Sequence, residues 1–387
     1  MGREWKRILT GLLVAGVLCA PAWAGAAPVD GETDIAACTA AITAHPQDAS
    51  AYNARGRAYD AVGKNELALA DYTKAIELRP DYSNAYFNKG MVLCEIGRYA
   101  ESVAAFDKVL AMDDKDAEAY IERGGAKYAW HHGLEAVQDY SAALKLQPDN
   151  NDALYGRGLA YAQATLTDLA LKDFDELIRR QPDLAAAWAA RADTNLDEHR
   201  YTQALPDYAQ ALALDGKNAA YYDSRSVAYV ALKDFPAALK DLQQAVALAP
   251  DNQVYKDDLR IIENNMRAPL YLQDNHDWQF VGMETADEAA YIDKKSVKHL
   301  EDYDDYTKFS VRILLVDFSK DMQKSSGEET YEFLYSQNGK AFFRLGGERD
   351  WKEISKDVAM NTNVRAAKLA YEVYYGRKCP WLYGYDT

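Results

Sequence analysis

Small and apolar side chains recur along this chain with a period of 34 residues between Pro46 and Pro250. Within each period they fall into two runs with the spacing of amphipathic helices. The period ends at Pro46, Pro80, Asp114, Pro148, Pro182, Gly216 and Pro250. Proline and glycine stop helices, so the pattern predicts six contiguous units of two packed helices each, without insertion or deletion.

Two positions of the unit indicate how its helices pack. A small residue recurs in the first helix, where the helices must approach closely, and a large residue recurs in the second helix, where it fills the space between units. The small residues are Gly56, Gly90, Gly124, Gly158, Ala192 and Ser226, and the large ones are Tyr72, Phe106, Tyr140, Phe174, Tyr208 and Leu242.

The order of aromatic, glycine, aromatic, alanine, aromatic, alanine and proline in each unit resembles the tetratricopeptide repeat family over about residues 33–250. The first unit carries this order as Tyr52, Gly56, Tyr59, Ala68, Tyr72, Ala75 and Pro80. The resemblance implies an all-α solenoid at 33–266, with six repeats, an N-terminal half-repeat at 33–45 and a capping helix after Pro250. It also implies that the protein binds a protein or peptide partner in a concave groove.

In that family the groove is lined by the first helix of each repeat. The resemblance places the following side chains in it: Asn53, Arg57, Phe87, Met91, Ile121, Tyr128, Tyr155, Leu159, Asp193, Asp197 and Asp223. Phe87, Ile121 and Tyr155 hold equivalent positions and predict a contiguous apolar patch, which is unusual for bare surface. We expect these side chains to point away from the positions where helices pack. The alternative is that they are ordinary surface residues.

A basic column departs from the family pattern, because Arg or Lys replaces the usual Leu before the small residue. The column is Arg55, Lys89, Arg123, Arg157, Arg191 and Arg225, and an acidic column in the second helices is Asp71, Asp139, Asp173, Asp207 and Asp241. The repeat with Lys89 is also the one with Ala105 in place of Asp. This joint loss predicts an Arg–Asp pair inside each repeat. An anion-binding stripe is the alternative.

The 34-residue period stops before Trp278, and β-branched and aromatic residues become frequent. We predict a small α+β domain at 268–387. Its expected strands are 278–283, 289–292, 306–318, 329–336 and 340–345, with a turn at Asn338 and Gly339 and a helix at 361–375. An antiparallel meander with the helix on one face would result.

The front of this domain, from Trp278 to Gly282 and from Tyr291 to Val297, resembles surface-adhesin E-like domains. That resemblance implies a surface or secreted binding role. It keeps a second hypothesis open, in which the C-terminal domain is an adhesin-like or ligand-binding module and the solenoid presents it.

The N-terminus predicts export. Arg3, Lys6 and Arg7 precede an apolar run that ends before Ala22-Trp23-Ala24, the pattern of a signal peptide at 1–24 with cleavage after Ala24. The run is shorter than the roughly 20 residues of a spanning helix, so we expect no transmembrane segment in the mature chain. We expect a periplasmic, cell-surface or secreted protein. The net charge of −16 disfavours nucleic acid as a partner.

Catalytic and metal-binding motifs are missing from the sequence, so we expect neither enzymatic activity nor a cofactor. His131 and His132 fall where the third repeat turns, and we interpret them as turn residues. Asp302, Asp304 and Asp305 form a charged loop without the regular ligand spacing of a calcium site. Cys38 and Cys94 are expected to be buried, and Cys379 to be a packing residue without a histidine that would activate it.

Overall fold

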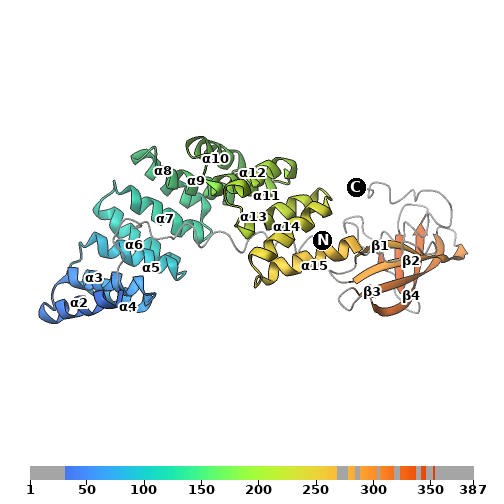
Figure 1. Ribbon diagram of the computed structural model, residues 1–387, viewed down its shortest axis with the longest axis horizontal. Helices are drawn as coiled ribbons and strands as arrows, with labels where there is room; N and C mark the ends of the chain where they lie inside the picture. The colour runs from blue at the N-terminus through green and yellow to red at the C-terminus, as the bar shows by residue number, and fades with distance from the viewer. Residues whose placement is uncertain are drawn as a thin grey trace. The chain divides into compact units, whose positions relative to one another are not determined.

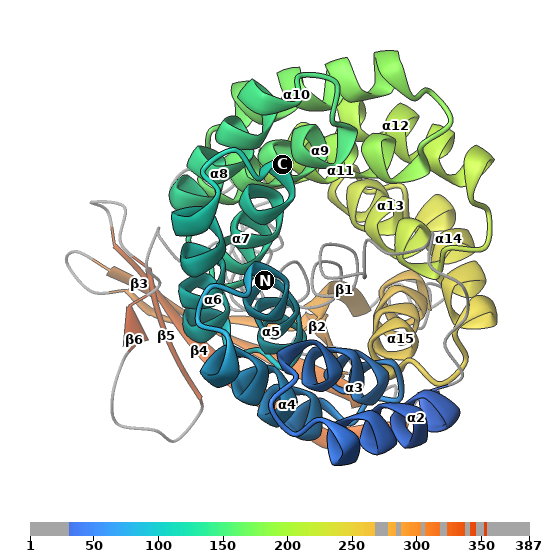
Figure 2. The ribbon, with the colours of Figure 1, turned by 90° about the vertical axis from the view of Figure 1, so that its left-hand side faces the viewer.

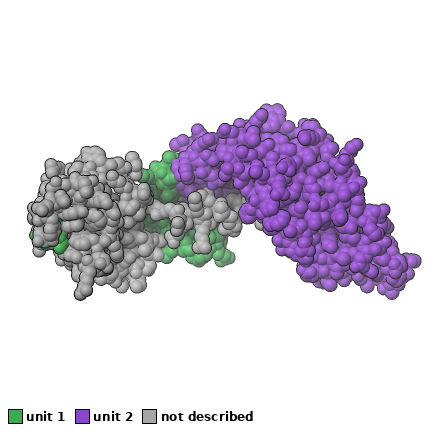
Figure 3. All heavy atoms as spheres, turned by 180° about the vertical axis from the view of Figure 1, so that it is seen from behind, with its two compact units in different colours: residues 1, 229–387 green, residues 2–228 purple. Residues whose placement is uncertain are grey.

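The computed structural model describes residues 31–267, 278–283, 288–302, 306–317, 323–336, 341–345 and 352–353. The predicted signal peptide at 1–24, the predicted helix at 361–375 and Cys379 lie outside these residues. Two compact units divide between Ala228 and Tyr229. The unit that comes first along the chain, residues 2–228, is purple in Figure 3 and is marked unit 2 there, and the one that follows, residues 229–387, is green where described and is marked unit 1. This division falls inside a helix of the solenoid, and the predicted boundaries at 33–266 and 268–387 stay predictions.

The first unit contains the repeats up to the sixth first helix. Its helices are α2 (Gly31–Ala44), α3 (Ala49–Ala61), α4 (Asn65–Leu78), α5 (Ser83–Glu95), α6 (Tyr99–Met112), α7 (Ala117–Ala129), α8 (Gly133–Leu146), α9 (Asn151–Gln163), α10 (Thr167–Arg180), α11 (Ala185–Asp197), α12 (Tyr201–Leu214) and α13 (Ala219–Ala231), whose last residues lie beyond the division. Figure 1 shows them as successive antiparallel pairs. The predicted all-α solenoid is confirmed, and α2 is the half-repeat that packs on α3.

Each repeat is closed by the residues that the sequence pattern indicates. The second-helix rings of Tyr72, Phe106, Tyr140, Phe174 and Tyr208 are all fully buried. A Cβ added at Gly158 would lie 2.6 Å from the Phe174 ring, so the small residue of the first helix is needed for this close approach. Asp48, Asp116 and Asn150 cap α3, α7 and α9 by accepting from backbone N–H groups.

The turn inside each repeat uses one residue in the left-handed backbone conformation. Gly63 and Gly97 hold this position in the first two repeats, and the later repeats place His131, Thr165, His199 and Lys233 there. His131 therefore serves the turn, as predicted. The neighbouring His132 ring stacks on Trp130 with the ring centroids 4.3 Å apart, and its Nδ1 lies 3.1 Å from Glu135 Oε1.

One of the two predicted buried thiols is not buried. Cys94 is buried, but Cys38 on α2 is partly exposed. The prediction for Cys38 was wrong because α2 packs mainly on α3 among the described helices, and most of its described side chains are at least partly exposed.

The second unit contains α14 (Phe235–Leu248), α15 (Gln253–Arg267) and six strands. The strands are β1 (Trp278–Met283), β2 (Glu288–Asp302), β3 (Tyr306–Asp317), β4 (Gln323–Ser336), β5 (Ala341–Leu345) and β6 (Lys352–Glu353). Helix α15 packs on α14 as the predicted capping helix, with Tyr255 and Ile262 buried.

The strands form one antiparallel meander in the order β1-β2-β3-β4-β5-β6, as predicted. Strand β2 continues to Asp302, well past the predicted end at Ile292. The sequence pattern missed this extension because residues 293–302 are mostly polar, and their place in the sheet comes from backbone pairing with β3 after a register shift. Ala290, Tyr291 and Ile292 are all buried, so both faces of the sheet are covered at this point.

Candidate functional site

The first helices of the repeats form the inner side of the curved first unit, and the second helices form its outer side (Figure 2). Successive first helices contact one another directly, α3 with α5, α5 with α7, α7 with α9 and α9 with α11. Asn88 on α5 donates to Oδ1 of Asn53 on α3 at 3.0 Å and joins two of them. We call the surface of α3, α5, α7, α9 and α11 that carries the predicted lining residues the inner face.

The apolar row predicted on this face also packs within the solenoid. Phe87 meets Phe106 edge to face with centroids 5.4 Å apart, and Tyr155 lies 6.2 Å from Phe174. Ile121 and Leu159 are half-buried against the cluster around Tyr140. The expectation that these side chains point away from helix packing was therefore wrong. The reason is that a first helix must fill the contact with its own second helix before it presents anything to solvent.

The beginning of the inner face is polar. Asn53 is buried, whereas Arg57 is exposed and Met91 is half-buried. Burial and the nearby Glu95 raise the pKa of Asp60 to about 6, and Arg57 acts in the opposite direction. This acid therefore has a cation beside it.

Further along, Asp193 on α11 lies among aromatic residues from other helices. Its Oδ1 accepts a hydrogen bond from the hydroxyl of Tyr208 on α12 at 2.5 Å. Burial and the Asp197 carboxylate raise the pKa of Asp193 to about 6, although hydrogen bonds from Tyr208 and Ser224 lower it. Asp197 is exposed and Asp223 is half-buried. A small part of Asp193 still reaches solvent.

The charge of Asp193 also acts on Tyr128 of α7 and Tyr155 of α9. Burial, followed by the charges of Asp193 and Asp197, raises the pKa of Tyr128 to about 12. The pKa of Tyr155 is raised by burial first and then by Asp193, Tyr221 and Tyr128. Residues from repeats three, four and five therefore influence one another electrostatically. The sequence pattern did not indicate that Tyr208, Tyr221 and Ser224 act on this group of residues. It assigned Tyr208 to the large second-helix residues that fill the space between repeats.

The basic column belongs to the framework and not to a stripe of free cations. Arg55, Arg123, Arg157 and Arg191 each bind the Asp of their own repeat through Nε and Nη2, at 2.6–3.0 Å. Lys89, which has no such Asp, donates to Thr73. The predicted pairs are confirmed for these four repeats.

The column also ties neighbouring repeats together. Arg123 binds Asp107 and Arg191 binds Asp175, both in the second helix of the preceding repeat. Arg55 makes the same reach through Nη1 to Thr39 on α2. The guanidinium groups thus bridge two second helices, which is a role that the planar, forked arginine side chain can fill.

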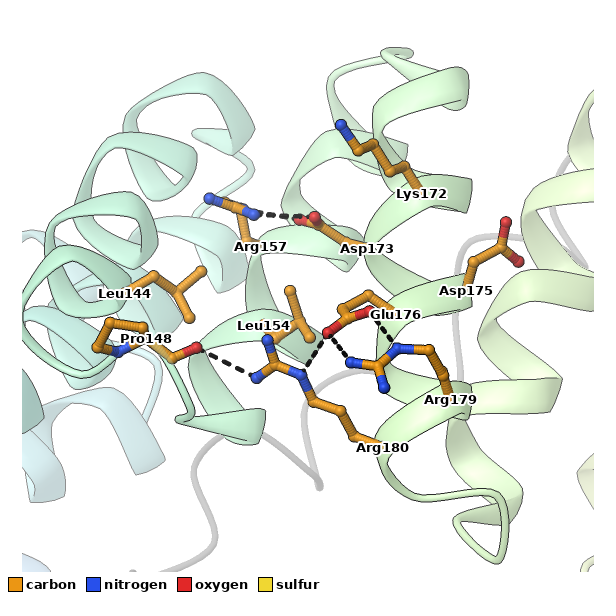
Figure 4. A pocket seen from close by; sticks show the side chains of 10 residues that line it. All are labelled: Leu144, Pro148, Leu154, Arg157, Lys172, Asp173, Asp175, Glu176, Arg179 and Arg180. Carbon is orange, nitrogen blue, oxygen red and sulfur yellow. Dashed lines mark hydrogen bonds and ion pairs between the residues drawn. The ribbon is translucent and has the colours of Figure 1, made fainter.

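A pocket of about 520 Å³ lies on α8, α9 and α10 and is lined by both signs of charge (Figure 4). Arg157 in its wall binds Asp173, and Arg179 and Arg180 both bind Glu176. Arg180 also donates to the Pro148 carbonyl oxygen at 3.1 Å. Most of the charges in the pocket wall are therefore paired with one another.

Metal and membrane sites are not found in the part of the chain that the structure describes. Those residues hold no group of three or more His, Cys, Asp or Glu side chains that could bind a metal ion. None of the described helices is long and apolar enough to cross a bilayer.

Comparison with known families agrees with this geometry. A tetratricopeptide repeat model matches residues 53–117, 163–219 and 189–253, and a second repeat model matches residues 135–164. This chain is a tetratricopeptide repeat protein. The family models match nothing after residue 253, so the resemblance of the C-terminal part to surface-adhesin E-like domains is unsupported.

One solved structure gives the same fold over the repeats. A tetratricopeptide repeat protein from Parabacteroides merdae ATCC 43184 is 20% identical with a TM-score of 0.52, over 61% of this chain and 93% of that one. PilF from Pseudomonas aeruginosa is 22% identical with a TM-score of 0.45, over 55% of this chain and 96% of that one. No curated protein matches the chain. Tetratricopeptide repeat proteins are generally scaffolds for protein partners.

Proposed function

We propose that this protein is a non-catalytic scaffold that holds a segment of a protein or peptide partner along the inner face. The observation that carries the proposal is the row of Phe87, Ile121 and Tyr155 at equivalent positions of α5, α7 and α9. These three side chains stay half-buried, although the rings of the second helices already fill the space between repeats. Apolar surface left accessible in a row across three repeats favours an apolar segment of a partner.

The export expected from residues 1–24 is part of the proposal. The scaffold would then meet its partner in the periplasm or at the cell surface. Mass spectrometry of the protein from its native cells tests this, and a mature chain that begins at Gly25 is the expected result. An intact Met1 would contradict export by this signal.

Site-specific photo-crosslinking in the native cells tests the binding face. A benzophenone amino acid replaces Met91 on the inner face in one variant and Leu134 on α8, whose side chain is 61% exposed, in a matched control. A third variant carries it at Leu300 of β2, which is 43% exposed. We expect a discrete adduct from Met91 and none from Leu134.

An adduct from Leu300 alone would move the binding activity to the sheet and contradict the inner-face proposal. Adducts of many masses at similar yield from all three positions would indicate random collisions and would contradict it as well. The Leu159→Ala variant adds a quantitative readout. Loss of a contact at an interface centre costs on the order of 2 kcal/mol, so the yield from Met91 should fall severalfold at limiting partner concentration.

A further inference from the structure

One guanidinium nitrogen in the wall of the pocket on α8, α9 and α10 has no partner among the described residues. Arg157 binds Asp173 through Nε and Nη2, and its Nη1 makes no hydrogen bond to any residue that the structure describes. Figure 4 shows the other end of the guanidinium pointing away from Asp173. The Arg157 side chain is only 24% exposed, and polar groups largely removed from water normally have a partner. This nitrogen is therefore a donor that the described part of the chain leaves open.

The repeats on either side show which group fits this donor. Nη1 of the equivalent arginine binds a carboxylate there, from Asp107 in one case and from Asp175 in the other. Ser141 stands at the equivalent position before Arg157 and carries no charge. The fourth repeat thus keeps the donor for a carboxylate, while the chain does not supply the carboxylate itself.

The lining of the pocket has one positive charge in excess. Its charged members are the cations Arg157, Lys172, Arg179 and Arg180 and the acids Asp173, Asp175 and Glu176. Each acid already binds at least one arginine, and Asp175 uses Arg191 from outside the lining. Lys172 makes no ion pair with a described residue. A positive lining in a chain with a net charge of −16 favours an anion at this place.

The rest of the lining is apolar. Leu144, Pro148 and Leu154 border the same pocket, and its volume of about 520 Å³ is in the range of sites for small ligands. Apolar walls with a few polar groups that point inward are typical of such sites. None of the lining residues is among those predicted to line the inner face, so this pocket is a separate surface.

A purely structural role accounts for the paired groups only. The bond between Arg157 and Asp173 fixes α9 against α10, and it uses Nε and Nη2. Water can accept from Nη1, but it does not balance the excess charge of the lining. The open nitrogen, the unpaired Lys172 and the pocket itself remain, and an anionic ligand accounts for all three.

We propose that this pocket binds the carboxylate of a ligand that also has an apolar part, and we call it the carboxylate pocket. The carboxylate would accept from Nη1 of Arg157, as Asp107 and Asp175 do from the neighbouring arginines, and Lys172 would add its charge. The apolar part would pack on Leu144 and Leu154. A free organic acid and a glutamate side chain in a protein segment offer this same chemistry. Such binding goes beyond the scaffold function of the inner face.

The experiment uses the full chain and two pairs of probes that differ in one charge. The first pair is 4-phenylbutanoate and its neutral amide, 4-phenylbutanamide. The second pair is the peptide acetyl-Gly-Leu-Glu-Leu-Gly-amide and the same peptide with Gln in place of Glu. Saturation-transfer difference NMR titrations at pH 7.5 measure the four Kd values. We expect the carboxylate of at least one pair to bind about fivefold more tightly than its amide, as a partly desolvated ion pair would provide.

A variant that fills the site from within assigns this preference to the pocket. Ser141→Asp offers Arg157 a carboxylate of its own chain and should reduce the preference to less than about twofold. Ala209→Asp is the matched control, because it adds the same charge at the equivalent, exposed position of the fifth repeat, outside the pocket lining. That variant should keep the full preference.

The contribution of Lys172 is tested in the same way. Lys172→Gln should reduce the preference to about half, because one of the two cationic groups that would face the carboxylate is lost. Lys240→Gln removes an exposed lysine at the equivalent position of the sixth repeat and should leave the preference unchanged. Circular dichroism of each variant checks that the helices are intact.

Equal binding within both pairs of probes would overturn the carboxylate pocket, as would the absence of binding by all four. A preference that survives in Ser141→Asp would overturn it too, since the carboxylate would then bind elsewhere. A preference in the first pair alone indicates a free acid, and a preference in the second alone indicates a protein segment. Crosslinking from Met91 does not involve this pocket. Adducts from Met91 without any carboxylate preference would leave the scaffold proposal standing and remove the pocket alone.

Discussion

Arg157 on α9 donates from Nε to Oδ2 of Asp173 at 2.7 Å and from Nη2 to Oδ1 at 2.8 Å. Both residues come from one repeat, and the carboxylate is the more deeply buried of the two. This two-point contact fixes the first helix of the fourth repeat against its second helix. The same contact recurs in the first, third and fifth repeats, so a single interaction is copied along the solenoid.

A double-mutant cycle measures what this contact contributes. Arg157→Ala leaves the buried Asp173 carboxylate without its cation, so it should lower the free energy of unfolding by about 1–3 kcal/mol. The coupling energy between Arg157→Ala and Asp173→Ala is expected to be on the order of 0.5–3 kcal/mol in urea denaturation. Arg179→Ala, at a side chain that is 71% exposed, is the control and should leave the denaturation midpoint unchanged. Strictly additive effects of the two alanines would contradict the pair.

A serine interrupts the contacts between neighbouring repeats. Asp107 and Asp175 reach forward to Arg123 and Arg191, and Ser141 holds the equivalent position before Arg157. The structure assigns Nη1 of Arg157 no hydrogen bond among the described residues. Ser141→Asp should add the missing ion pair and stabilise the solenoid by about 0.2–1 kcal/mol, the range of exposed pairs.

The stability gained by Ser141→Asp should be smaller in 1 M salt, because salt screens the attraction between exposed charges. Ser141→Asn is the neutral control, and thermal melts at low and high salt make the comparison. A gain of the same size from both substitutions would show that the charge is not responsible.

The turn residue Thr165 has φ of 58°, where glycine stands in the first two repeats. A left-handed conformation costs a residue with a Cβ roughly 1–2 kcal/mol. Glycine avoids this cost, but it loses more conformational freedom on folding, which offsets part of the gain in stability. Thr165→Gly should therefore stabilise the protein by about 0.5–1 kcal/mol, measured as a rise in the urea midpoint. Gly63→Thr is the reciprocal test and should lower the urea midpoint. A Thr165→Gly variant less stable than the wild type would mean that the Thr165 hydroxyl contributes more than the strain costs.

The buried acid Asp193 should contribute to the pH dependence of stability. Its pKa of about 6 in the folded protein lies above the unfolded value of about 3.9, so the folded state takes up the proton first. The stability that this group contributes is present at low pH and is lost as pH rises through about 6. The wild type should gain Tm relative to Asp193→Asn when pH falls from 7.5 to 5. Asp60 and Asp258 are present in both proteins and cancel in the difference. Parallel curves of Tm against pH would contradict the raised pKa.

The sequence by itself determined the repeats, the helix pairs and the Arg–Asp contacts. The reason is that each of these interactions joins residues of the same or the next repeat, and a solenoid unit contacts only its neighbours. Arg157 and Asp173 stand at a constant spacing that five of the six repeats share, and the loss of both members in the second repeat indicated the pair. The order of the strands followed as well, because a meander joins neighbours in the chain.

Tertiary structure alone decided the surroundings of Asp193. Tyr128 and Asp193 lie two repeats apart, and their proximity depends on how far each repeat rotates relative to the last. That rotation is small, it accumulates along the array, and it is set by the packing of many side chains at once. The same is true of Tyr155, which the column pattern placed on the inner face and which packing against Phe174 leaves half-buried. Local spacing specifies contacts between neighbouring helices, whereas the meeting of more distant repeats requires the whole curved array.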